Sequence, residues 1–364
     1  MNAPPLPLPK KNLIVYCLGG AFHWFHEIFM RRLGYRPDFF VDRTMPTGSV
    51  FEGIPAFSDI GPRIPMPDRG RYTVVVCAGK EEAFLSIQAA LVRDGFQSVV
   101  WLHQLYEVHD PFELSRHDFD APGAAQREEN IFAARALLED ALSREIFDRF
   151  IETHQTRIPV VIPKSPADEQ YFPSDIGTAV SMERLVLCGA GSHDLSHVAQ
   201  KITSPIESLA VFEADPHVFR SLANDNRLAG PSGQIRGLAR TFSLSPCAVC
   251  SATEIRPFIS CRGFGSRLHP DGSRMVQTIA LDQAILGIEP SYICMDIEGA
   301  ELEAVTGARR IIESSRTDLA ISVYHKASHI WEIPLLIHTF NPDYRLHLRN
   351  YTGFCAETIL YAST

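Results

Sequence analysis

The feature that most constrains the fold is an alternation of short apolar runs with amphipathic helical stretches, which occurs twice along the chain. The first series contains NLIVYCL (12–18), PDFFVD (37–42), YTVVVCAG (72–79) and SVVWL (98–102). The second begins near Met182 and contains RLVLC, SLAVFEADP, SYICMDIEG and DLAISVYH. Strands that alternate with helices form parallel sheets. The sequence therefore predicts two α/β domains, and its 364 residues are more than a single core usually holds.

The segments around these two series set the expected organisation of the chain. The last two apolar runs, YRLHLRNY (344–351) and CAETILYA (355–362), are separated by too few residues for a crossover, so they predict an antiparallel hairpin. Residues 125–154 have a helical pattern that is ended by several prolines. We expect a flexible tail over 1–11, a smaller Rossmann-like α/β domain over 12–115, a helical linker over 116–166 and a second, mostly parallel α/β domain over 167–364.

Charge and composition narrow the range of partners. The net charge of −9 argues against nucleic acid, because an acidic surface repels phosphate groups. No apolar run approaches the roughly 20 residues that span a bilayer, and the segment MNAPPLPLPKK lacks the apolar core of a secretory signal. Most of the eight cysteines lie in apolar runs, which is typical of buried thiols in cytosolic proteins. We expect a cytoplasmic protein that binds a small molecule or a saccharide; a homo-oligomer stays open.

One cysteine pair has the spacing of a metal motif. Cys247 and Cys250 form a lone CxxC, whereas a zinc site needs about four ligands. No second CxxC or HxxxH follows at the spacing of such sites. We therefore expect no metal site and favour a structural hairpin; whether a divalent ion assists the protein elsewhere is left open.

Ligands of open parallel sheets bind beyond the carboxyl ends of the strands, where the strand order reverses. In the second series this edge begins with Gly189, Ala190 and Gly191, where glycine lets the backbone approach a ligand, although a plain tight turn has the same pattern. Glu213 ends the next strand, 24 residues after Gly189, which is the spacing of an acid that binds ribose hydroxyls. The alternative for Glu213 is a charge that favours a helix N-terminus. Together these residues predict a site for an adenosine-containing cofactor.

The segment MDIEGAE (295–301) places three acids beside one strand end. The dipole of the following helix can account for acids at positions 298 and 301, because it favours negative charge in the first helical turn. It accounts less well for Asp296, which ends the strand itself. His325 ends the following strand, and strands joined by one crossover are usually neighbours, so His325 and Asp296 should face one cleft. We expect Asp296 or a neutral His325 to act as the catalytic base, with Glu298 orienting the acceptor. The alternative for His325 is a surface position at the start of a loop.

At these residues the chain resembles the FkbM family of methyltransferases. The most specific segment is MDIEGAELEAVTGA (295–308). The other matching segments follow in order: LLEDALSREIFDRF (137–150), DEQYFPSDI (168–176), LCGAGSHDL (187–195), VFEADP (211–216), GFGSRL (263–268), TIALD (278–282), AISVYHKASHIWEIPLLI (320–337) and YRLHLRNYTGFCAETILYA (344–362). The resemblance implies a Rossmann-like class I methyltransferase domain. It also implies S-adenosylmethionine as cofactor and methyl transfer to a hydroxyl oxygen of a sugar, glycan precursor or secondary metabolite.

The resemblance also implies which residues hold the cofactor. Gly189 and Gly191 would approach its methionine part, and Glu213 would bind its ribose. Ala190 and Asp296 would line the same site. No metal ligand is implied.

The chain departs from the family's pattern at two positions. Leu187 stands where the family usually has an acid, and His193 stands where a glycine is common. Asp194 could replace the missing carboxylate, but from a different position. These departures motivate a second hypothesis, in which the protein retains the methyltransferase fold but only binds its ligand.

The N-terminal series resembles, more loosely, the small Rossmann-like domain of some sugar-modifying acyltransferases. The resemblance rests on VYCLGG, FFVD and FEGIPAFSD (51–59). The segment GGAFHW does not satisfy G-x-G-x-x-G, which argues against a dinucleotide. A nucleotide-sugar site and a purely structural role both stay open for this domain.

Overall fold

The computed structural model describes most of the chain, which divides into two compact units. The described residues are 8–17, 22, 25–32, 34–46, 48–78, 81–102, 105, 124–156, 160–176, 182–190, 197–198, 200–224, 239–261, 265–314 and 317–364. The first unit comprises Met1–Glu113 and Glu152–Val160, and the second comprises Leu114–Ile151 and Val161–Thr364. The domain bounds given above stay predictions, and residues 1–7 of the expected tail lie outside the described part.

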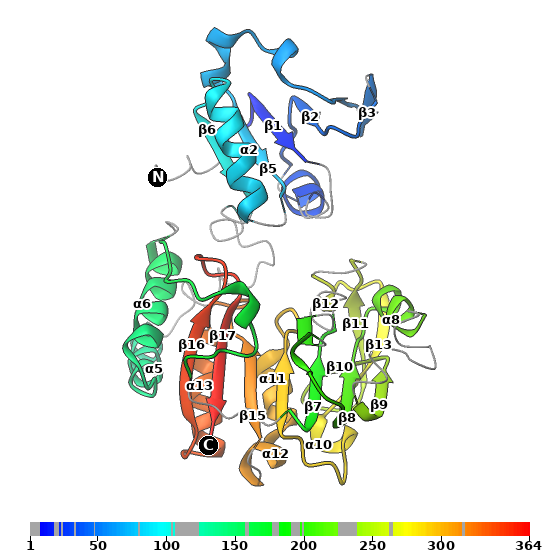
Figure 1. The fold of residues 1–364 in the computed structure, drawn as a ribbon, viewed down its shortest axis with the longest axis vertical. Helices are drawn as coiled ribbons and strands as arrows, with labels where there is room; N and C mark the ends of the chain where they lie inside the picture. Colours follow the sequence, from blue (N-terminus) through cyan, green and yellow to red (C-terminus); the bar gives the residue numbers. More distant parts are fainter. Residues whose placement is uncertain are drawn as a thin grey trace. The chain divides into compact units, whose positions relative to one another are not determined.

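The first unit contains a six-stranded sheet in the order β3-β4-β2-β1-β5-β6. Its elements are β1 (Leu13–Tyr16), η1 (Phe25–Arg32), β2 (Phe39–Val41), β3 (Ser49–Phe51), β4 (Ile54–Phe57), η2 (Gly61–Arg63), η3 (Met66–Arg71), β5 (Thr73–Val76), α2 (Glu81–Arg93) and β6 (Ser98–Trp101). Among the described strands of this sheet, β3 pairs with β4 in an antiparallel manner, and the other pairings are parallel. Helix α2 crosses one face of this sheet (Figure 1). The α/β character and the mostly parallel sheet predicted for this part of the chain are confirmed, and its Rossmann-like character stays a prediction.

The second unit contains a seven-stranded sheet in the order β16-β17-β15-β14-β7-β8-β9. The strands are β7 (Arg184–Cys188), β8 (Ile206–Phe212), β9 (Ala239–Ser245), β14 (Tyr292–Met295), β15 (Asp318–Ser322), β16 (Arg345–Asn350) and β17 (Thr358–Ser363). Strand β17 is antiparallel to β15 and β16, and the other pairings are parallel. The mostly parallel sheet with an antiparallel C-terminal hairpin is therefore confirmed. Because β8 and β14 flank β7 on opposite sides, the strand order reverses at β7, where ligands of such sheets bind.

Two apolar layers cover the faces of this sheet, because side chains alternate between the faces along each strand. The described helices that lie wholly or mostly in this unit are α5 (Ala124–Ala136), α6 (Ala141–Thr156), α8 (Pro216–Ala223), α10 (Leu281–Ala284), α11 (Glu301–Gly307), α12 (Arg309–Ser314) and α13 (His329–Phe340), with the short η4 (Ala167–Glu169). Val186 and Cys188 pack with side chains of α5, α6, α11, α12 and α13. Leu185 and Leu187 pack on the other face, with Leu222 of α8. Leu187 is only 2% exposed, so the position that departs from the family's acid is part of the core.

A smaller sheet is inserted between β9 and β14. Its strands are β10 (Cys247–Val249), β11 (Ile255–Ile259), β12 (Arg267–Leu268) and β13 (Arg274–Ile279), in the order β10-β13-β11-β12. Strand β10 pairs with β13 in a parallel manner, so the expectation that Cys247 and Cys250 lie in a hairpin is wrong. The Cys250 thiol donates a hydrogen bond to Glu303. We refer to this sheet, together with the loops that join its strands, as the insert.

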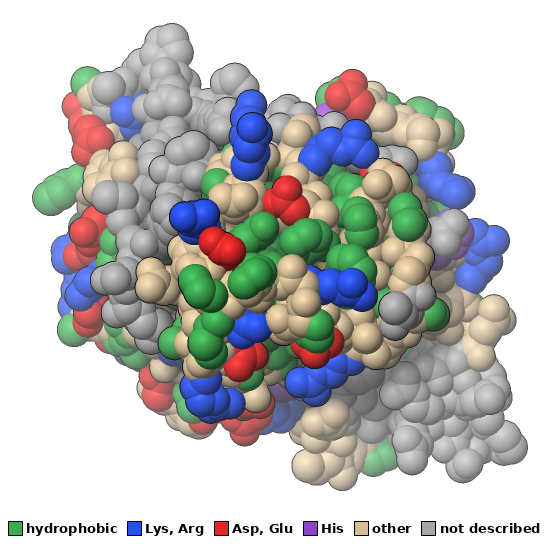
Figure 2. All heavy atoms as spheres, turned by 90° about the horizontal axis from the view of Figure 1, so that it is seen from above, with side chains coloured by type: hydrophobic (Ala, Val, Ile, Leu, Met, Phe, Trp, Pro, Cys, Tyr) green, Lys and Arg blue, Asp and Glu red, His purple; other side chains and the backbone are tan. Residues whose placement is uncertain are grey.

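The surface of the chain mixes both signs of charge. On the face shown in Figure 2, the described Lys and Arg side chains alternate with Asp and Glu and with hydrophobic groups. Among the described residues, none of the helices has both the length and the apolar character needed to cross a membrane.

Arg349 of β16 joins three segments of the second unit. Its side chain is 3% exposed and contacts Asp140 at 2.9 Å and Asp175 at 2.8 Å. It also donates a hydrogen bond to Ser143 of α6. Burial raises the pKa of Asp140, but hydrogen bonds from Arg349 and Ser143 outweigh this effect and lower that pKa to about 2.

We predict that Arg349→Met lowers the free energy of unfolding by about 3 kcal/mol at pH 7, because two carboxylates lose their buried partner. The control is Arg345→Met. Arg345 lies on the same strand, and its side chain is 63% exposed beside Glu139. This substitution should lower the free energy of unfolding by less than about 1 kcal/mol. Asp140 has a lowered pKa, so its contribution exists above the ordinary Asp pKa and is lost as the pH falls toward about 2. Denaturant unfolding at pH 7 and pH 3 should show that the difference in free energy of unfolding between the wild type and Arg349→Met is smaller at pH 3. Equal deficits for the two variants would contradict the assignment.

Candidate functional site

The end of β7 is packed directly against the end of β14. Gly189 follows β7 with a φ of +79°, and its N–H donates to the carbonyl of Phe212 in β8. A Cβ at this position would lie 1.8 Å from the carbonyl oxygen of Asp296. Glycine is therefore required here both by the backbone angle and by the approach of Asp296. Gly191, which we expected beside the cofactor, lies outside the described residues, as do His193 and Asp194.

Glu213 lies at the end of β8, next to this turn. Its carboxylate accepts the Ala190 N–H at 3.2 Å and the Asp215 N–H at 2.6 Å, and the residue is 8% exposed. The Gly189 turn and the end of β8 thus meet as the spacing predicts.

The helix that follows β8 is capped by a different acid. Asp215 is the N-cap of α8 and accepts the backbone N–H groups of His217 and Val218. Glu213 accepts the N–H of this N-cap residue at 2.6 Å, so the helix-start alternative for Glu213 stays open. Asp215 also accepts hydrogen bonds from Ser260 at 2.8 Å and Ser266 at 2.6 Å, which connects the insert to the end of β8. Burial raises the pKa of Asp215, but these hydrogen bonds lower it below its ordinary value.

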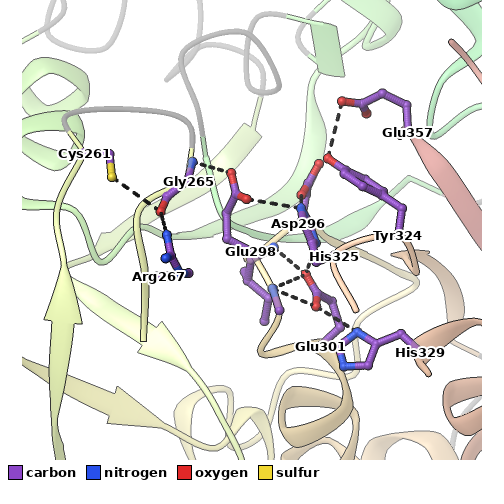
Figure 3. Close-up of polar contacts among 12 residues, drawn as sticks. Cys261, Gly265, Arg267, Asp296, Glu298, Glu301, Tyr324, His325, His329 and Glu357 are labelled. Carbon is purple, nitrogen blue, oxygen red and sulfur yellow. Dashed lines mark hydrogen bonds and ion pairs between the residues drawn. The ribbon is translucent and has the colours of Figure 1, made fainter. Parts of the chain in front are cut away.

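Asp296, Glu298, Glu301 and His325 form one cluster beyond β14 and β15, which we call the carboxylate–histidine cluster (Figure 3). Nε2 of His325 lies 3.3 Å from Oδ1 of Asp296 and 3.3 Å from Oε2 of Glu298. Nδ1 of His325 lies 2.8 Å from Oε1 of Glu301. Strands β14 and β15 are neighbours, so Asp296 and His325 meet as expected.

Glu301 is the most buried acid of the cluster and the one that holds its parts together. Its side chain is fully buried and accepts the backbone N–H groups of Ile297 and Gly299. His329 of α13 lies 3.2 Å from its second oxygen. Burial raises the pKa of Glu301, but the neighbouring His325 and the hydrogen bonds outweigh burial and hold that pKa well below its ordinary value. The sequence suggested only a helix-dipole role for Glu301.

His325 is buried among carboxylates in this arrangement. Its side chain is 1% exposed, so the alternative of a surface histidine is wrong. Burial lowers the pKa of His325, but the charges of Glu301, Glu298 and Asp296 raise it to about 10. The three carboxylates favour the protonated ring over the neutral ring that we expected, and the assignment of His325 to the site stays a prediction.

Asp296 and Glu298 are each positioned by a donor from another segment. The Tyr171 hydroxyl donates to Oδ2 of Asp296 at 3.1 Å, and the Gly265 N–H of the insert donates to Oε1 of Glu298 at 2.6 Å. Glu298 has a φ of +56°, and burial raises its pKa despite the opposing effect of His325. The side chains of Asp296 and Glu298 are 16% and 19% exposed. They are therefore the members of the cluster that a ligand can reach.

The comparison with solved structures gives a clear likeness. The crystal structure of the methyltransferase FkbM from Methylobacillus flagellatus KT matches with a TM-score of 0.67 and 21% sequence identity. The match covers 97% of this chain and 90% of that one. The protein has the fold of an FkbM methyltransferase. The resemblance drawn from the sequence is thereby confirmed for the fold, and the FkbM match extends over both units. No protein-family model matches the sequence, and no curated protein matches it.

We predict that Gly189→Ala destabilises this FkbM-like fold more than Gly287→Ala does. Gly287 has the same backbone angle, with a φ of +78°, but no atom lies within 4 Å of its added Cβ. The free energy of unfolding of both variants should fall by about 1–2 kcal/mol, because alanine disfavours the left-handed conformation. Gly189→Ala should lower this free energy by a further amount of about 1–3 kcal/mol, because its Cβ must displace the end of β14. Denaturant unfolding measures both losses, and equal losses would show that the approach of Asp296 is not tight.

Proposed function

We propose that the protein is an S-adenosylmethionine-dependent methyltransferase that methylates a hydroxyl oxygen of a small molecule, namely a sugar, a glycan precursor or a secondary metabolite. The observation that carries this proposal is the convergence of Gly189, Glu213 and Asp296 where the strand order reverses, in a chain with a methyltransferase fold. The proposal places the cofactor over the ends of β7 and β8 and the acceptor beside Asp296 and Glu298.

The residues present fit such a cofactor. Glu213 would accept hydrogen bonds from the ribose hydroxyls, because its carboxylate lies at the sheet edge beside the Gly189 turn. The backbone at Gly189, Ala190 and Gly191 would approach the methionine part, with Asp296 closing the site. When bound, S-adenosylmethionine supplies the methyl group on its sulfonium sulfur.

The acceptor must lose a proton to a group that it can reach. The carboxylates of Asp296 and Glu298 are partly exposed, whereas the side chain of His325 is almost fully buried. We assign Asp296 as the base and Glu298 as the residue that orients the acceptor hydroxyl. His325 would hold the carboxylates of Asp296 and Glu298 in place through its Nε2 atom instead of accepting the proton itself.

The alternative function is a binding protein that keeps the fold without catalysis. It is favoured by Leu187, because the position that would supply a carboxylate to the cofactor's amino group is a buried core residue. Calorimetry separates the two functions: heat on titration with S-adenosylmethionine supports the enzyme, and its absence with intact folding supports the alternative.

We predict that Glu213→Gln weakens S-adenosylmethionine binding by about 10- to 100-fold, because charge-assisted hydrogen bonds to the ribose are lost. Glu207→Gln is the matched control, since Glu207 lies at the opposite end of the same strand and its side chain is 61% exposed. Titration calorimetry of the two variants and the wild type measures the effect. If both variants bind like the wild type, Glu213 does not contact the cofactor.

A further inference from the structure

We propose that Tyr171 is a positioning residue for methyl transfer, which holds the carboxylate of the assigned base Asp296 in one orientation. This role rests on the proposed function, because it takes Asp296 as the base. The contacts that fix Tyr171 and Asp296 are features of the fold and can be tested without an acceptor.

Asp296 is held through both of its carboxylate oxygens. The Tyr171 hydroxyl donates to Oδ2 at 3.1 Å, and Oδ1 lies 3.3 Å from Nε2 of His325. The last torsion of an aspartate side chain is soft and has broad minima, so contacts to two different oxygens are needed to fix the plane of the carboxylate. A base must lie within hydrogen-bond reach of the proton that it removes. The orientation of this carboxylate therefore bears directly on the rate.

Tyr171 lies against the face of the sheet from which Asp296 projects. Its side chain is 1% exposed and packs in the apolar layer that contains Tyr292 of β14. Side chains alternate between the two faces along a strand, and the backbone pairing of β14 with β7 continues to the Asp296 N–H. Tyr292 and Asp296 therefore project from the same face, and one strand carries both the base and a residue that supports Tyr171.

Two buried hydroxyls hold the backbone of Tyr171. Its N–H donates to the hydroxyl oxygen of Tyr361 at 2.9 Å, and its carbonyl accepts the hydroxyl of Tyr292. Tyr361 lies in β17 and Tyr292 in β14, with β15 between these strands. The backbone of Tyr171 is thus attached to the sheet at two separate strands.

The backbone of Tyr171 is strained. Its φ of +65° lies in the left-handed region, which is costly for a bulky residue other than glycine. Such strain persists only where the surrounding structure fixes it, and it is concentrated at functional sites. In this conformation the backbone meets Tyr361 and Tyr292 while the hydroxyl reaches Asp296. The strain is therefore linked to the contact with the base.

The residue before Tyr171 is fixed as well. The Gln170 side chain donates to Glu357 at 2.6 Å, and the Gln170 carbonyl oxygen lies 2.9 Å from Nε2 of His197. A residue that orients a catalytic group must itself be held by its surroundings. Tyr171 meets this requirement through its own backbone and through Gln170.

The test compares Tyr171→Phe, which removes the hydroxyl and keeps the ring, with the control Tyr344→Phe. Tyr344 is 5% exposed, and its hydroxyl donates to the carbonyl of Thr317 at 2.6 Å. Thr317 directly precedes β15, at the edge of the sheet opposite to Asp296. Each variant loses one buried hydroxyl contact, so we expect similar losses of stability. The assay measures transfer of a labelled methyl group from S-adenosylmethionine to the small-molecule fraction of an extract of the source cells. Calorimetry counts the cofactor-binding sites, and rates are expressed per site.

We expect the saturating rate of Tyr171→Phe to fall by about 10- to 100-fold, because the base is no longer held in place. Its affinity for S-adenosylmethionine and the extract concentration that gives half the saturating rate should stay nearly unchanged. Tyr344→Phe should react like the wild type. A wild-type rate for a folded Tyr171→Phe variant would overturn the positioning role and leave the proposed function intact. No transfer by the wild type would contradict the proposed function, and the role of Tyr171 with it.

A second measurement needs no acceptor. Crystal structures of the wild type and of Tyr171→Phe should show the Asp296 carboxylate in one orientation in the wild type, and in a different orientation or in several in the variant. The same single orientation in both proteins would overturn the positioning role, whatever the protein methylates.

Discussion

The close approach of Gly189 to the backbone of Asp296 is the constraint on which the site depends. It brings the ends of β7 and β14 together where the strand order of the sheet reverses. On one side of this contact, the Ala190 N–H reaches Glu213, and on the other side Asp296 reaches the carboxylate–histidine cluster. A single glycine thus sets the distance between Glu213, which the proposed function assigns to the cofactor, and the carboxylate–histidine cluster, which it assigns to the acceptor.

The second constraint is the burial of several charges in a small volume. Buried carboxylates are costly unless they are paired and hydrogen-bonded. Here Glu301 is satisfied by two backbone N–H groups and His325, while Asp296 and Glu298 are held by Tyr171 and Gly265. These donors come from the segment before β7 and from the insert. The electrostatics of the cluster therefore tie both segments to the sheet edge beyond β14 and β15.

The sequence predicts those parts of the site that follow from strand order and spacing. Glu213 meets the Gly189 turn because neighbouring parallel strands end at one edge, and Asp296 meets His325 for the same reason. The contacts of Tyr171 and Gly265 span long loops, for which the sequence carries no periodic signal. The charge of His325 depends on three carboxylates converging on one ring, and hydrophobic patterns do not report such an arrangement. The roles of these residues stay predictions until a ligand is bound.

The most direct test of the account is a crystal structure of the protein soaked with S-adenosylhomocysteine. The account predicts that the ribose hydroxyls contact Glu213, that the amino-acid part lies along the Gly189 turn, and that the sulfur points toward Asp296. Density for the ligand away from the ends of β7 and β8, or none at a saturating concentration, would contradict it.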